Sequence, residues 1–259
     1  MSVECARSVE GHKCSFVRIA LTIAALGAGE FSGGCSGESK PSTTKIIEPH
    51  RPAIERFVAS LDAIQEHMAT APTAEAPVDS GGVMLEASCS EGNCEQRNTV
   101  IVAATELGSL SRLGKKNRPS DTKVQASSER NLWLLLRWLD GLLGSNDELS
   151  IRSVQDLVTW YPRIRYAAVV TTERTVDGAG HITTFRGGWW YGHAVVWDLA
   201  QGRWLPGRVT AEVEDNRKLV SVNTASPSQS INRSVNGKIN EAIAEALRTR
   251  SHAVARTQQ

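Results

Sequence analysis

Residues 189–199 alternate between bulky and small side chains, and only an extended strand turns that period of two into separate faces. The bulky positions are Trp189, Tyr191, His193, Val195, Trp197 and Leu199. After the turn at residues 200–202, residues 203–214 alternate again, with most odd positions apolar and most even positions polar. This pattern predicts an antiparallel hairpin in a sheet that has one covered and one solvated face.

More strands are predicted on both sides of this hairpin. Residues 165–176 and 181–186 flank a glycine-containing turn, which predicts a second hairpin. Residues 83–88 and 98–104 are predicted to pair as two strands across the turn that contains Cys89 and Cys94, and residues 219–222 to add an edge strand.

Apolar residues at three- and four-residue spacing predict amphipathic helices before and after the strands. These predicted helices cover residues 52–69, 127–143, 151–159 and 234–248. Residues 223–232, rich in Ser and Asn, are predicted to form a loop. The chain is therefore predicted to be α+β, an antiparallel β-meander of about four to six strands with helices packed on one face. Residues 51–250 are expected to form a single domain, and residues 251–259 a frayed tail.

The N-terminal segment has the pattern of an export signal. Basic residues precede an uncharged apolar run at residues 19–29, and small residues then lead to Cys35. This run is shorter than the roughly 20 residues that a transmembrane helix needs. Residues 1–34 are therefore predicted to be a signal peptide.

Gly33, Gly34 and Cys35 match the last three positions of a lipobox, so residues 1–45 resemble the signal region of bacterial lipoproteins. The resemblance implies that Cys35 is acylated and that Ser36 favours the outer membrane, with the domain facing the periplasm. Residues 35–50 then form the lipid-bearing end and a flexible tether. Ser32 and Gly34 also suit an ordinary signal peptidase, which would leave a soluble periplasmic or secreted protein.

The cysteine count bears on the same question. Cys5 and Cys14 lie in the predicted signal peptide, whereas Cys89 and Cys94 flank a short turn. In an oxidising compartment this pair is expected to form a disulfide that contributes about 2 kcal/mol, and a pair of reduced thiols is the alternative. Cys35 is then left unpaired, and acylation would account for it.

The remaining composition argues against several classes of function. The chain has 29 basic and 28 acidic residues, a balance that does not favour nucleic-acid binding. It contains no His-x-x-x-His pair, no Gly-x-Ser-x-Gly elbow and no phosphate-binding loop. We therefore expect no metal site, no cofactor and no catalytic residue. The expected partners are the membrane, through the lipid, and another envelope protein held by the polar sheet face or an exposed edge strand.

A second hypothesis concerns the aromatic segment that begins the hairpin. Arg186, Trp190, Tyr191 and His193 could together bind a small ligand or a glycan, with hydrolysis as one such activity. The competing interpretation is that Trp189, Tyr191 and His193 form core beneath the helices, while Trp190 faces the other way and is exposed.

The acylated N-terminus is directly testable. Mass spectrometry of protein extracted with detergent is expected to find a mature chain that begins at a lipid-modified Cys35. Recovery from the soluble fraction of a chain that begins at another, unmodified residue would refute the anchor.

Overall fold

The computed structural model describes residues 43–88, 95–113, 123–141, 151–181, 184–215 and 226–257. The chain divides into two units, residues 1–40 and 41–259, and all of the described residues belong to the second unit. The predicted signal peptide, Cys35, the pair Cys89 and Cys94, and the predicted strand at residues 219–222 lie outside the described residues. Within the described ranges, no helix combines the length and the hydropathy that a membrane-spanning segment requires.

The helices and strands alternate irregularly along the chain, and together they confirm the α+β class. The helices are α1 (Thr43–Ile47), α2 (Arg51–His67), α3 (Leu110–Leu113), α4 (Arg130–Leu139), α5 (Ile151–Trp160) and α6 (Pro227–Thr257). The strands are β1 (Thr99–Ala103), β2 (Tyr166–Val176), β3 (Ala179–Gly180), β4 (Phe185–Arg186), β5 (Trp189–Asp198), β6 (Arg203–Trp204) and β7 (Val209–Glu214).

The main sheet of the described residues is mostly antiparallel, as predicted. β2 and β5 form its centre, and β5 pairs on its other side with β7 and β6. β1 pairs with β2 in parallel, whereas β3 and β4 form a separate small sheet. The predicted pairing of residues 83–88 with β1 is wrong, because the backbone N–H groups of Asn98 and Thr99 both donate to the Glu86 carbonyl and no ladder continues.

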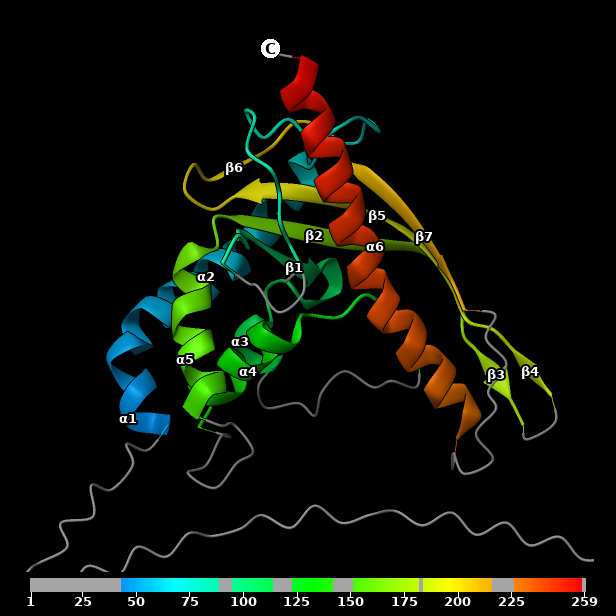
Figure 1. The fold of residues 1–259 in the computed structure, drawn as a ribbon, viewed down its shortest axis with the longest axis horizontal. Helices are drawn as coiled ribbons and strands as arrows, with labels where there is room; N and C mark the ends of the chain where they lie inside the picture. Colours follow the sequence, from blue (N-terminus) through cyan, green and yellow to red (C-terminus); the bar gives the residue numbers. More distant parts are fainter. Residues whose placement is uncertain are drawn as a thin grey trace, which may run out of the picture. The chain divides into compact units, whose positions relative to one another are not determined.

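Helices α1 to α5 cover one face of the sheet, and we call this apolar layer the α2 core (Figure 1). The sheet contributes alternate residues to it: Val100, Val102, Ala167, Val169, Val195 and Trp197. In α2, Ile54, Val58, Leu61 and Ile64 are buried at three- and four-residue steps, as the predicted helix requires.

The opposite face is covered by α6, which corrects the prediction that helices pack on one face only (Figure 1). In this α6 core, Val235, Ile239, Ile243 and Leu247 pack with Trp190, Ala194, Val196 and Val209 of the sheet. Both faces of β5 are therefore apolar along its second half. From the sequence, the face with the small even-numbered residues of β5 was predicted to be solvated. In the structure these small side chains leave space for α6.

Both ends of the domain extend further than predicted. Ile47 of α1 is 1% exposed, so the packed domain begins before residue 51. α6 continues to Thr257 in place of a frayed tail from residue 251, and Ser251 is buried and accepts a hydrogen bond from the Leu85 backbone N–H. The predicted loop at residues 223–232 is also wrong in part, because α6 begins at Pro227.

Trp190 fits beneath α6 because Gly192 leaves space for its ring. A Cβ at Gly192 would lie 2.4 Å from Trp190 Cζ2 and 2.3 Å from the Thr171 carbonyl oxygen. The indole N–H of Trp190 donates to Thr172 Oγ1 at 2.9 Å, so its polar atom is paired. The glycine is thus required by packing in the middle of a strand.

Replacing Gly192 with Ala is expected to destabilise the domain by about 1–3 kcal/mol, because the added methyl group overpacks a site closed by backbone and ring. Chemical denaturation measures the change. Gly237→Ala is the matched control, because Gly237 lies on the exposed side of α6 and a Cβ there meets nothing within 4 Å. The free energy of unfolding of this control variant is expected to rise by about 0.5–1 kcal/mol, because Ala favours a helix more than Gly does. Equal losses of stability in both variants would contradict the packing of Trp190 over Gly192.

Candidate binding surface

The long strands β2 and β5 continue beyond the part of the sheet that helices α1 to α5 cover (Figure 1). Along β2, residues 166–170 are buried, Thr171 is half-buried and residues 172–176 are exposed. On the same face of β5, Val195 and Trp197 are buried, but the positions before them are only partly covered. We call this uncovered region the open half-face. Its residues are Thr171, Glu173, Arg174, Val176, Trp189, Tyr191, His193, Thr210, Glu212 and Glu214.

Two aromatic rings lie next to each other on the open half-face. The rings of Trp189 and Tyr191 are 9° from parallel, with centroids 6.4 Å apart. The indole N–H of Trp189 donates to Glu212 Oε1 at 2.5 Å across the β5–β7 pair. This hydrogen bond orients the larger ring, and both side chains remain accessible to a ligand.

Charged groups of both signs surround these rings. His193 Nδ1 lies 2.7 Å from Glu173 Oε1, and Arg208 Nη1 lies 3.9 Å from the same oxygen. Glu173 stands at a β-bulge between Thr172 and Arg174, where two residues of β2 face one of β5. The bulge therefore puts Arg174 opposite Tyr191, a position that regular alternation would give to Glu173, and the Glu173 carboxylate contacts His193 instead.

A second polar group lies further along β7. The Thr210 hydroxyl donates to Glu75 Oε1 at 2.7 Å, and Arg250 of α6 lies 3.3 Å from the same oxygen. The hydrogen bond from Thr210, with Arg250 and Arg208 nearby, holds the pKa of Glu75 below its ordinary value. These contacts attach the segment before β1 to the edge of the sheet.

The four residues of the ligand-site hypothesis do not converge. Tyr191 and His193 share the open half-face, but Trp190 lies on the other face and is 0% exposed. Arg186 is exposed in β4, where its guanidinium lies 3.5 Å from the Asp177 carbonyl oxygen. The alternative interpretation is also corrected: Trp190 is core, and Trp189, Tyr191 and His193 are partly exposed.

The sequence patterns did not predict the partners of these aromatic residues, which are Glu173, Arg208 and Glu212. Glu212 could not have been found, because the predicted alternation puts the even-numbered residues 208–214 on the face away from Tyr191, whereas the observed register pairs Glu212 with Tyr191. Glu173 could not be found either, because residues 165–176 were predicted to pair with residues 181–186, whereas in the structure β2 pairs with β5.

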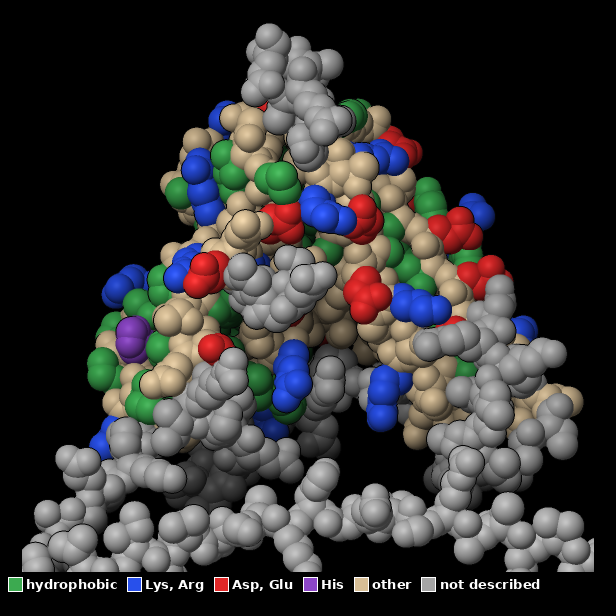
Figure 2. All heavy atoms as spheres, in the orientation of Figure 1, with side chains coloured by type: hydrophobic (Ala, Val, Ile, Leu, Met, Phe, Trp, Pro, Cys, Tyr) green, Lys and Arg blue, Asp and Glu red, His purple; other side chains and the backbone are tan. Residues whose placement is uncertain are grey.

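On the face of the molecule drawn in Figure 2, neither sign of charge forms a continuous patch. Basic and acidic side chains are interspersed on the face that carries α6 (Figure 2). Among the described residues, no group of three or more His, Cys, Asp and Glu side chains could hold a metal ion. No known protein family matches the chain, and no curated protein or solved structure is significantly similar to it.

Substitutions should separate the open half-face from the core. Trp189→Ala is expected to change the free energy of unfolding by about 1 kcal/mol or less, because the ring is partly solvated. Trp190→Ala is expected to cost about 3–5 kcal/mol, because it empties a completely buried site. Urea titrations compare the two, and similar losses would place Trp189 in the core.

Proposed function

We propose that the protein is an exported, lipid-anchored envelope protein that acts as an interaction module and not as an enzyme. Its partner is the folded surface of another envelope protein, held on the open half-face. The observation that carries the proposal is the uncovered sheet surface, which bears an ordered aromatic pair among charges of both signs. Cys35 provides the anchor, with a soluble periplasmic or secreted form as the alternative.

The chemistry of this surface supports a protein partner. Trp, Tyr and Arg are enriched at the energetic centres of protein interfaces, and the open half-face contains Trp189, Tyr191 and Arg174. Alternating charges favour a partner with complementary charges in one orientation and disfavour others. Such a surface needs no deep pocket, because affinity comes from complementary packing over a broad area.

A glycan is the second candidate, and the nearly parallel rings of Trp189 and Tyr191 favour it. Aromatic rings stack on the apolar faces of sugars, while carboxylates such as Glu212 accept hydrogen bonds from hydroxyl groups. This version differs from the ligand site predicted from sequence, because Trp190 and Arg186 have no part in it.

Site-specific photocrosslinking in the native host tests the protein partner. A photoreactive phenylalanine analogue at Tyr191 is expected to give one discrete protein adduct, which disappears when Glu212→Lys is added. The same analogue at exposed Met84 serves as the control. Failure to form an adduct at Tyr191, or the same adduct at both positions, would contradict the proposal.

Sedimentation with purified peptidoglycan tests the glycan candidate. If sugars are the ligand, the wild-type protein should sediment with the polymer, and Trp189→Ala should reduce the bound fraction several-fold. The crosslinked protein adduct should then be missing. If neither polymer nor protein binds, the open half-face has no role in recognition.

A further inference from the structure

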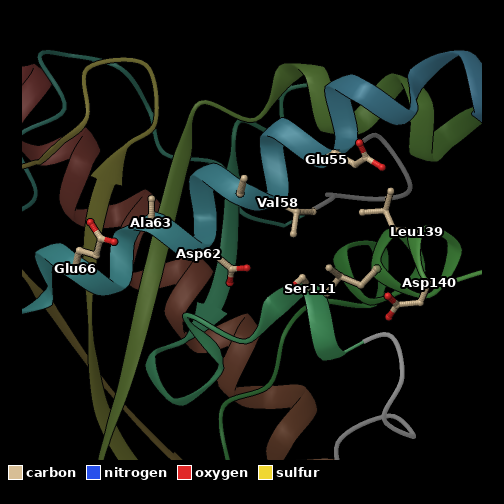
Figure 3. A pocket seen from close by; sticks show the side chains of 10 residues that line it. Glu55, Val58, Asp62, Ala63, Glu66, Ser111, Leu139 and Asp140 are labelled. Carbon is tan, nitrogen blue, oxygen red and sulfur yellow. The ribbon is translucent and has the colours of Figure 1, made fainter.

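A groove of about 600 Å³ lies between α2, α3 and α4, away from the open half-face (Figure 3). Its apolar lining comes from α2 and α4. Its acidic residues come from α2 and from the C-terminal end of α4. The apolar lining residues are Val58, Ala59, Ala63, Leu136 and Leu139, and the acidic ones are Glu55, Asp62, Glu66 and Asp140. We call this the helical groove.

The carboxylates of the helical groove are little neutralised. Glu55 has Arg51 at 3.8 Å, which is a loose and exposed ion pair. Asp62 accepts a hydrogen bond from the Leu110 backbone N–H, which carries no formal charge. Asp140 Oδ2 is buried without a hydrogen-bond partner among the described residues. None of the described residues that line the groove is Lys or Arg, so the formal charges of this lining are all negative.

The floor of the groove is shaped to receive a helix. Ala59 and Ala63 are one turn apart on α2 and exposed, so a second backbone can approach closely between the longer side chains of Glu55 and Glu66. Leu139 of α4 is only partly covered on the opposite wall. A hydrophobic groove of this kind binds the apolar face of an amphipathic helix.

We propose that the helical groove binds an amphipathic helix of a partner protein, with aliphatic residues on one face and Lys or Arg beside them. The apolar floor selects the aliphatic face, and the four carboxylates select the basic flanks. An acidic helix, or a surface of anionic lipid, would be repelled by the same rim. The inference does not depend on the open half-face, so the protein has two recognition surfaces of different chemistry.

Fluorescence anisotropy with a labelled synthetic helix of Leu and Lys tests the proposal on the purified full chain. The peptide is expected to bind at physiological ionic strength, whereas a matched helix of Leu and Glu is not. Glu66→Lys should weaken binding roughly tenfold, which corresponds to about 1.4 kcal/mol. Ala63→Trp should abolish it by filling the groove without changing any charge.

Two controls make the result specific. Glu241→Lys changes the net charge by the same amount at an exposed position of α6, and it should leave the peptide affinity unchanged. Trp189→Ala should also leave it unchanged, which separates this site from the proposed function. The inference is overturned if the Leu/Lys helix fails to bind, if Glu241→Lys weakens binding as much as Glu66→Lys, or if a folded Ala63→Trp variant, checked by its melting curve, binds normally.

Discussion

The burial of Trp190 beneath α6 determines which face of the sheet every other side chain of β5 occupies. Because successive strand residues point to opposite faces, a shift of one residue would exchange the two faces completely. Trp190 is the largest side chain among those fully buried, and its ring has space only over Gly192. Its position therefore directs Trp189, Tyr191 and His193 to the other face, beyond the reach of the helices that form the α2 core.

A buried ion pair protects the far edge of the same sheet. Arg97 pairs with Glu129 before α4, and Glu129 Oε1 also accepts a hydrogen bond from the Ile101 backbone N–H. Arg97 is 6% exposed, and this burial lowers the pKa of its guanidinium to about 10. One carboxylate thus covers an edge amide of β1 and attaches α4 to the sheet. An uncovered edge invites pairing with other chains, so this contact also favours solubility.

The sequence predicted the secondary structure better than its arrangement in space. The alternation at residues 189–214 correctly predicted the β5–β7 pairing, and α2, α4 and α5 lie close to their predicted ranges. The parallel β1–β2 pairing joins segments more than 60 residues apart, so no local pattern reveals it. Tyr191 and His193 were among the predicted site residues, but the place of Glu173 beside them depends on the β2–β5 pairing, and the burial of Trp190 depends on α6, which follows it in the chain. Local periodicity says which residues share a face, and not what covers that face.

α6 follows every described strand of the sheet in the chain, and this order has a consequence for biosynthesis. When the folding chain has emerged only as far as β7, Trp190, Ala194 and Val209 have partners within the sheet but no helix over them. The incomplete chain therefore exposes an apolar, aggregation-prone surface until α6 has folded onto it. During this period the chain depends most on binding by chaperones. A chain interrupted before Val235 would keep its strands, lose their cover and become a substrate for quality-control proteases.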